Sequence, residues 1–237
     1  MLIEIEGPSG AGKTTLIGAM AAACKRNLVI DIAARERMAG GVAWQLGEIM
    51  RRLDAPLGHP EAIFVYAARA AARVRLAVEA GENRNLVLCD RLRLSLHVQA
   101  RLAGLSHEHA AQLVRVATRA AGRIHTIMLD VNHDGHCRRL SDQGDTPLPK
   151  YTFNKLRTYF RDAYACQTED KLYIDTSPLR SSDVHGRVLT HLTELLNSTA
   201  PPDLDGGDHR VGSGYADSAS EDTTAGAATM KLRRIGL

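Results

Sequence analysis

Three glycines, a lysine and two threonines stand close together in the segment IEGPSGAGKTT at residues 5–15, where Gly7, Gly12, Lys13 and Thr14 fit the pattern G-x-x-x-x-G-K-[ST]. Glycines in such a loop let successive backbone N–H groups turn inward around a phosphate, where a Cβ would obstruct the approach. The lysine supplies a mobile cation for the β- and γ-phosphates, and the threonine hydroxyl is the usual ligand of magnesium. The segment therefore predicts a binding site for a nucleoside triphosphate. The residues expected to form it are Gly7, Pro8, Ser9, Gly10, Ala11, Gly12, Lys13, Thr14 and Thr15.

Short apolar runs alternate with helical patterns along most of the chain. The glycine loop lies between the apolar run at residues 2–6 and a helical pattern that begins near Lys13. Further runs of this kind stand at residues 27–31, 85–90, 124–131 and 171–175. Five strands that alternate with helices predict an α/β fold of three layers, with a five-stranded parallel sheet flanked by helices on both faces.

The segments between the strands predict where the helices and loops lie. Apolar residues recur three and four apart over residues 59–80, which predicts a long amphipathic helix. Residues 93–122 predict two helices, the second of them capped by Ser106. The segment 141–150 is rich in Gly, Pro, Asp and Ser, so we expect a mobile loop there.

A charged pair, Asp90 and Arg91, closes the apolar run NLVLC. Open parallel sheets bind ligands at the carboxyl ends of their strands, which is where this pair should lie. The carboxylate of Asp90 can hold magnesium through water or orient an acceptor, and the guanidinium of Arg91 can grip an acceptor phosphate with two parallel bonds. Phosphoryl transfer needs mainly such positioning and charge neutralisation.

Several segments, taken in order, resemble the thymidylate kinases: IEGPSGAGKTT, EAIFVYAARAAARV, LVLCDRLRLS, IMLDVNHDGHCRRL, FNKLRTYF and LYIDTSPL. After the glycine loop, the most specific are YAAR at residues 66–69 and DR at 90–91, and the resemblance extends to about residue 197. It implies the P-loop kinase fold, ATP and Mg²⁺ as cofactors, and a small nucleoside monophosphate, dTMP first, as the acceptor that becomes a diphosphate. Homodimers formed through helices are common in that family.

The resemblance also implies roles for individual residues. In the family, the arginine of the AAR helix contacts the acceptor base, the arginine of DR contacts the acceptor phosphate, and the neighbouring aspartate serves the reaction centre. These roles fall to Arg69, Arg91 and Asp90. We expect Lys13, Asp90 and Arg91 to be catalytic residues, and Thr14 and Asp90 to be the metal ligands.

Two of the family's features differ at the expected acceptor site. The family commonly has a carboxylate in place of Ser9, where it accepts a bond from the sugar 3′-hydroxyl, and an aromatic ring in place of Val65, where it stacks on the base. We still assign Ser9 and Tyr66, which follows Val65, to the acceptor site. Because both changes concern the acceptor, the sequence supports the kinase chemistry better than it supports dTMP as the substrate.

Arginines outside the glycine loop complete the predicted site. Arg35 stands in the stretch that resembles the family's Arg-Glu-Pro-Gly-Gly, although the fixed turn of the proline is missing, and we assign Arg35 to the acceptor phosphate. Some members of the family carry an arginine in the glycine loop, where this chain has Gly10. Members without that arginine usually supply the cation from a lid after the fourth strand. We expect Arg139 to be this catalytic cation, ahead of Arg138 and Lys150, with a solvated helix end as the alternative for all three.

Two other functions remain open at the level of sequence. The same fold can phosphorylate a nucleoside or another small hydroxyl metabolite, which the changes at Ser9 and Val65 favour. It can also serve as a nucleotide-hydrolysing regulator, in which the P-loop controls conformation. The segment GPSGAGK is similar to the P-loop of guanylate kinases as well, but the later segments do not follow that family.

The composition narrows the function classes further. A net charge of +3 over 237 residues shows no dense basic stripe, so we expect no nucleic-acid partner. Four cysteines without paired spacing, no apolar run near the roughly 18 residues of a membrane span, and no signal peptide indicate a cytoplasmic protein. We assign residues 1–199 to one domain with its lid at 141–150. Residues 200–237 have few bulky apolar side chains, and we expect them to be disordered.

Overall fold

Five parallel strands form one sheet, in the order β2-β3-β1-β4-β5. The computed structural model describes residues 1–23, 29–52, 59–81, 86–168 and 170–198. The strands are β1 (Leu2–Glu6), β2 (Val29–Asp31), β3 (Leu86–Asp90), β4 (Ile124–Asp130) and β5 (Lys171–Asp175). Each of the five apolar runs became a strand, and the parallel sheet expected from the sequence is confirmed.

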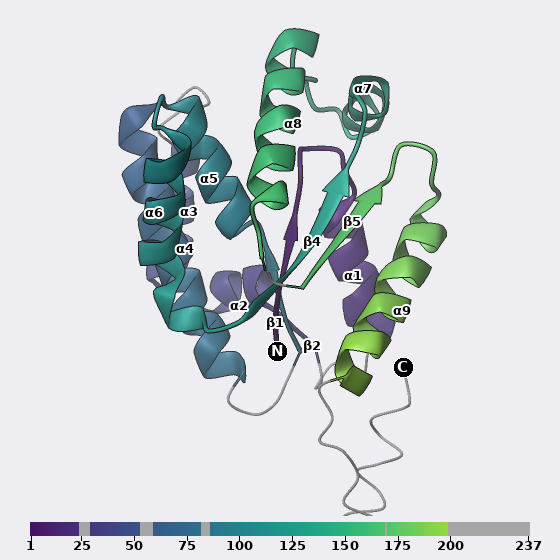
Figure 1. Cartoon of the computed structure of the whole chain (residues 1–237), viewed down its shortest axis with the longest axis horizontal. Helices are drawn as coiled ribbons and strands as arrows, with labels where there is room; N and C mark the ends of the chain where they lie inside the picture. The colour runs from purple at the N-terminus through teal and green to yellow at the C-terminus, as the bar shows by residue number, and fades with distance from the viewer. Residues whose placement is uncertain (24–28, 53–58, 82–85, 169, 199–237) are drawn as a thin grey trace, which may run out of the picture. The chain divides into compact units, whose positions relative to one another are not determined.

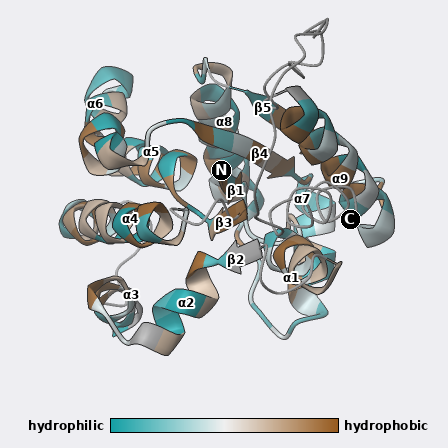
Figure 2. Cartoon of the chain, turned by 90° about the horizontal axis from the view of Figure 1, so that it is seen from below, coloured by the Kyte–Doolittle hydropathy of each residue, from teal (hydrophilic) through white to brown (hydrophobic). Residues whose placement is uncertain are grey.

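Helices follow the strands and cover both faces of the sheet. They are α1 (Lys13–Ala23), α2 (Ile32–Ala39), α3 (Val42–Arg52), α4 (Pro60–Gly81), α5 (Arg93–Leu102), α6 (His107–Thr118), α7 (His133–Ser141), α8 (Lys150–Ala165) and α9 (Ser181–Ser198). In Figures 1 and 2, α1 lies on one side of the sheet and α4, α5 and α6 lie on the other. None of the helices in the described part of the chain is long and apolar enough to cross a membrane.

The chain divides into two compact units, Met1–His191 and Leu192–Leu237. The first unit contains the whole sheet and the glycine loop. Of the second unit the structure describes only the last residues of α9. The predicted disordered tail at 200–237 lies outside the described residues, as does Cys24.

Local signals in the sequence placed α4, α5 and α6 correctly. The amphipathic pattern at 59–80 became α4, and the pair expected over 93–122 became α5 and α6. The side chain of Ser106 caps α6 by accepting the N–H of His109 at 3.2 Å, because a hydroxyl at this position satisfies one of the free donors of the first turn. The expected loop at 141–150 is the connection between the end of α7 and the start of α8.

The central strand β1 is buried along its whole length, but its side chains are not all apolar. Ile3 and Ile5 belong to the apolar core, whereas Glu4 and Glu6 alternate with them and are equally inaccessible. Glu4 accepts both the backbone N–H and the Nε–H of Arg93, at 2.8 and 2.9 Å, and the hydroxyl of Thr126 at 2.6 Å. This buried ion pair connects the start of α5 to β1. Its burial is tolerated because Arg93 also donates to the carbonyl oxygen of Ile124 and the hydroxyl of Thr126.

Replacing one partner of this pair should be strongly destabilising. Arg93→Met leaves the Glu4 carboxylate buried without its cation, and we expect the free energy of unfolding to fall by about 3–5 kcal/mol. Urea unfolding at neutral pH measures the change, and Arg115→Met, an exposed arginine on α6, is the matched control. Adding Glu4→Gln to Arg93→Met should recover part of the loss. An Arg93 variant as stable as the Arg115 control would contradict a stabilising role for the pair.

Candidate active site

The glycine loop joins β1 to α1 in a conformation that only glycine tolerates at its turning points. Gly7, Gly10 and Gly12 have φ angles of 134°, 77° and 96°, which side-chain-bearing residues rarely adopt. A Cβ on Gly7 would lie 1.9 Å from the carbonyl oxygen of Leu129 on β4. The predicted context of the loop, after a strand and before a helix, is therefore confirmed.

The side chain of Lys13 folds back onto the glycine loop that precedes it. Its Nζ donates to the carbonyl oxygen of Pro8 at 2.8 Å, and its side chain is buried. Burial, helped by the charge of Arg91, lowers the pKa of Lys13 to about 7, against the opposing effects of Asp90 and Glu6. An anion bound in the loop would favour the charged amine, so a group that is costly to bury is suited to binding a phosphate there.

A cavity of about 780 Å³ opens beside the loop. The loop residues that line it are Ser9, Gly10, Ala11, Gly12, Lys13, Thr14, Thr15 and Leu16. The rest of its wall comes from the region of α7 (Arg138, Arg139, Leu140, Asp142, Gln143, Asp145), from the end of β3 and the residue after it (Asp90, Arg91), and from the segment after β5 (Thr176, Leu179, Ser181, Val184). Gly7 and Pro8 do not line the cavity, and they shape the loop from behind.

The two arginines near the end of α7 differ in how they are held. Arg139 donates to the carbonyl oxygen of Gly10 at 2.9 Å, and to the hydroxyl and carbonyl oxygens of Thr176 at 2.9 and 2.6 Å. Arg138 is exposed and lines the same cavity, and its side chain has no hydrogen bond to the described residues. Lys150, at the start of α8, does not line the cavity. Arg139 therefore braces the loop, whereas the side chain of Arg138 is exposed beside the cavity.

A buried histidine, which the sequence analysis did not single out, joins the loop to the lid. His136 has its Nδ1 2.9 Å from the carbonyl oxygen of Ser9, and its Nε2 accepts the N–H of Leu148 at 3.0 Å. The acceptor role of Nε2 makes Nδ1 the protonated nitrogen, so the ring is neutral here. Its ring stacks on Phe153 of α8 at 4.3 Å between centroids. One side chain thus fixes the glycine loop, the segment before α8, and α8 itself.

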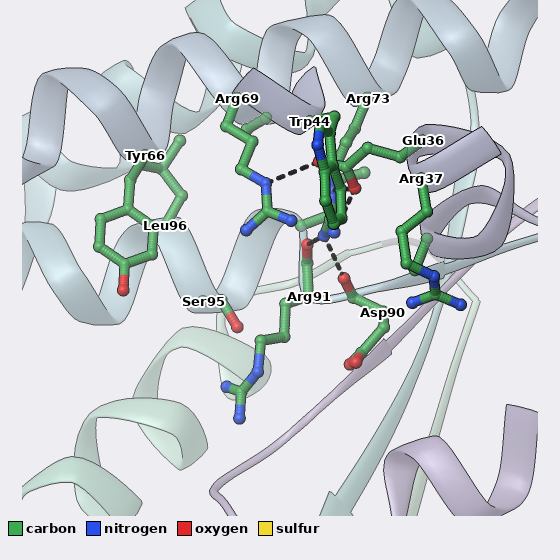
Figure 3. Close-up of a pocket in the computed structure, with 13 residues that line it drawn as sticks. Glu36, Arg37, Trp44, Tyr66, Arg69, Arg73, Asp90, Arg91, Ser95 and Leu96 are labelled. Carbon is green, nitrogen blue, oxygen red and sulfur yellow. Dashed lines mark hydrogen bonds and ion pairs between the residues drawn. The ribbon is translucent and has the colours of Figure 1, made fainter. Parts of the chain in front are cut away.

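A second cavity, of about 400 Å³, lies on the other side of the end of β3 (Figure 3). Its lining combines apolar and aromatic side chains (Ala33, Trp44, Tyr66, Ala70, Leu92, Leu96) with charged or polar ones (Glu36, Arg37, Arg69, Arg73, Asp90, Arg91, Ser95). Flat aromatic rings and a guanidinium suit a planar base, and Arg91 at the other end suits a phosphate. Asp90 and Arg91 line both cavities, so they form the wall that the two cavities share.

Arg91 has an unusual backbone. Its φ is 60°, and among the described residues it is the only one other than glycine with a positive φ. This left-handed conformation costs about 1–2 kcal/mol. Its guanidinium lies 3.5 Å from the carbonyl oxygen of Gly7 and 3.4 Å from the hydroxyl of Ser9. The arginine that the sequence places at a strand end thus reaches the glycine loop, and the backbone strain is the cost of that orientation.

Asp90 offers a carboxylate oxygen to a ligand. Its Oδ1 is buried and has no hydrogen-bond partner among the described residues, which is costly for a carboxylate unless a ligand or ion completes it. The hydroxyl-bearing Thr14 lines the same cavity from the first turn of α1. Magnesium at phosphoryl-transfer sites takes only one or two carboxylates beside phosphate oxygens and water, so this pair fits a magnesium ion.

The structure brings most of the predicted acceptor residues together. Arg69 and Tyr66 line the second cavity, whereas Val65 does not, so the ring one residue further along α4 faces the site. Arg35 is exposed and lines neither cavity, and Arg37 lines the second one instead. A role for Arg35 at the acceptor phosphate stays a prediction to which the geometry adds nothing.

Among the residues of the second cavity, the sequence analysis did not assign Trp44, Glu36 or Arg73 to the site. Trp44 is the single tryptophan of the chain and is on α3, a helix that no motif marked. Glu36 and Arg73 pair across 37 positions in the sequence, with Nη2 2.7 Å from Oε2. The arginine spacing of α4, with Arg73 one turn after Arg69, was the signal that could have pointed to the second of these cations.

Proteins that hold a triphosphate in a glycine loop and a second ligand across the neighbouring strand end are P-loop kinases, and this is the class that the fold and the site define. Comparison with known sequences is more specific. The family model described as thymidylate kinase matches residues 5–188. The chain belongs to the thymidylate kinase family, a family of nucleotide kinases.

Individual relatives agree with this assignment. The chain is 31% identical to a thymidylate kinase of Bacillus mycoides (strain KBAB4) over 134 residues, which are 55% of this chain and 64% of the relative. It is 30% identical to a thymidylate kinase of Bacillus cereus (strain B4264) over 61% of this chain and 71% of the relative. Among solved structures, the YorR protein of Bacillus subtilis in complex with phosphorylated GDP has a TM-score of 0.51 at 17% identity, covering 85% of this chain and 100% of that one, which shows a shared fold.

Lys13→Met tests the electrostatic cost of burying the amine. With a pKa of about 7 in the folded state against an ordinary value of 10.5, Lys13 binds more protons in the unfolded chain across that window. The penalty of burial is therefore complete below pH 7 and falls as the pH rises toward 10. We expect the variant to be more stable than the wild type at about pH 6, with the difference shrinking by about pH 9.5, in urea unfolding followed by circular dichroism. A difference independent of pH would contradict the lowered pKa.

Proposed function

We propose that this protein catalyses ATP- and Mg²⁺-dependent phosphoryl transfer to a nucleoside monophosphate, with dTMP to dTDP as the first candidate reaction. The single observation that carries the proposal is that Asp90 and Arg91 line both cavities. A donor bound at the glycine loop and an acceptor bound beside α4 would meet at this shared wall. Membership of the thymidylate kinase family supports the same reaction.

The residues of the donor side would act by neutralising charge. The loop N–H groups and Lys13 hold the β- and γ-phosphates, and Thr14 and Asp90 hold the ion. Magnesium, when bound, neutralises the charge that develops on the phosphate oxygens. Arg139 keeps the loop in place through the carbonyl oxygen of Gly10.

On the acceptor side, Arg91 would hold the phosphate of the monophosphate. It is oriented toward the glycine loop by its contacts with Gly7 and Ser9, so the attacking phosphate would face the donor. Arg69, Tyr66 and Trp44 surround the other end of the cavity and would hold the base by hydrogen bonding and stacking. Ser9 lines the first cavity beside Arg91, and from there its hydroxyl would be offered to the sugar.

A different acceptor is the main alternative. Ser9 gives the sugar a weaker partner than a carboxylate would. The ring that lines the cavity is that of Tyr66, one residue after the family's usual aromatic position, which is Val65 in this chain. The fold relative in complex with phosphorylated GDP makes purine monophosphates worth including. A hydroxyl metabolite without phosphate is less favoured, because Arg91 would then have no anion to bind.

A panel of acceptors tests the proposal. The wild-type chain with ATP and Mg²⁺ should convert dTMP, or another nucleoside monophosphate such as dGMP, to its diphosphate, and binding should change the fluorescence of Trp44, the single tryptophan. Arg91→Ala should raise the acceptor KM by about 10-fold or more, since a hydrogen bond to a charged group is lost. Transfer only to unphosphorylated acceptors, or ATP hydrolysis without transfer, would contradict the proposal.

The two arginines of α7, Arg138 and Arg139, should give different kinetic phenotypes. Arg138→Met removes the exposed cation, and we expect kcat to fall by about 100-fold or more with little change in thermal stability. Arg139→Met removes the brace on the loop and Thr176, so the KM for ATP should rise and the melting temperature should fall. Steady-state kinetics and thermal melting of both variants measure these effects. The reverse pattern would make Arg139 the cation that reaches the phosphates.

A further inference from the structure

Arg73 is a buried arginine whose donors are divided between a carboxylate and a strand end. Its Nε and Nη2 donate to the same oxygen of Glu36, at 3.0 and 2.7 Å. Its Nη1 donates to the carbonyl oxygens of Asp90 and Arg91, at 2.5 and 3.1 Å (Figure 3). A fork of this kind fixes the position of the guanidinium in its plane, which a flexible amine cannot do.

These contacts hold one side of the strained backbone at Arg91. The N–H of Arg91 donates to Ile5 of β1, and the N–H of Leu92 donates to Glu6, so β1 holds the amide side. The carbonyl oxygens of Asp90 and Arg91 both face Arg73, which therefore holds the other side. A non-glycine residue stays at φ 60° only where its surroundings determine the conformation, and Arg73 is part of those surroundings.

The same carboxylate connects this backbone to the base end of the cavity. The second oxygen of Glu36 accepts the Nε–H of Arg69 at 2.9 Å, and the guanidinium of Arg69 lies against Gly47 of α3. Burial acts to raise the pKa of Glu36, but the hydrogen bonds and charges of Arg69 and Arg73 outweigh it and lower the pKa, so Glu36 is ionised between two cations. A change in the position of Arg69 would therefore reach Arg73 through the carboxylate of Glu36, which both arginines contact.

We infer that Arg73, held by Glu36, is a positioning residue for the transfer reaction: it sets the backbone of Asp90 and Arg91 so that Arg91 faces the glycine loop, and it links that orientation to the base end of the acceptor cavity. The inference rests on the proposed function. It assigns Arg73 no contact with substrate, because its donors are taken up by protein oxygens. Its effect on turnover would therefore pass through the residues whose backbone it holds, and chiefly through the strained Arg91.

A double-mutant cycle between Arg73 and Arg91 tests this inference. Arg73→Lys keeps a positive charge beside Glu36 but cannot hold one carboxylate and two carbonyl oxygens at once. In the wild-type background we expect it to lower kcat by about 10-fold to 100-fold and to leave the KM for ATP within about twofold, because only the acceptor end of the site is misplaced. In the Arg91→Ala background we expect the same change to have almost no further effect on kcat or on the acceptor KM.

A merely structural role predicts a different pattern. It would lower the melting temperature and impair both backgrounds to the same extent, and such an additive cycle would overturn the role of Arg73. Arg75→Met, an exposed arginine on the same helix, is the matched control and should leave all parameters unchanged. If Arg73→Lys melts well below the wild type, Glu36→Gln, which keeps the shape of the clamp and removes its charge, takes its place in the cycle. Absence of transfer by the wild-type chain would instead overturn the proposed function, and the inference with it.

Discussion

Burial of two carboxylates on the central strand is the constraint on which the rest of the structure depends. Glu4 and Glu6 are inaccessible to solvent, and a buried carboxylate is costly unless its oxygens receive hydrogen bonds. Backbone N–H groups within residues 92–95 supply several of these bonds. Burial and the charge of Glu4 raise the pKa of Glu6 to about 7, against the effect of those bonds. The turn after β3 is thereby fixed to β1, and this turn begins with Asp90 and Arg91.

The position of that turn explains why the two cavities meet where they do. β3 lies next to β1 in the sheet, and the glycine loop leaves the end of β1, so the ends of both strands face the same edge. Arg91 points across this edge only in a left-handed conformation, which the chain tolerates because β1 and Arg73 hold both sides of its backbone. Strain at this point and rigidity around it are thus parts of one arrangement.

The glycine loop is held from outside in a similar way. Its carbonyl oxygens at Ser9 and Gly10 are bonded by His136 and Arg139, both on α7. When the carbonyl oxygens of a tight loop are turned outward, its N–H groups are left to face inward, which is the arrangement that an anion requires. The residues that follow β4 therefore have two tasks, to line the cavity beside the glycine loop and to hold the loop in its conformation.

The sequence by itself determined the five strands, the glycine loop and the pairing of Asp90 with Arg91 at a strand end, because these follow from apolar periodicity and local steric requirements. Only the tertiary structure decided which side chains meet across long separations. Glu36 and Arg73 lie on different helices, and nothing in the local pattern of either helix indicates that a buried ion pair forms between them. The same holds for His136 on the glycine loop: its bonds exist only once α7 packs beside that loop, since hydrogen bonding and burial depend on the neighbours that folding supplies.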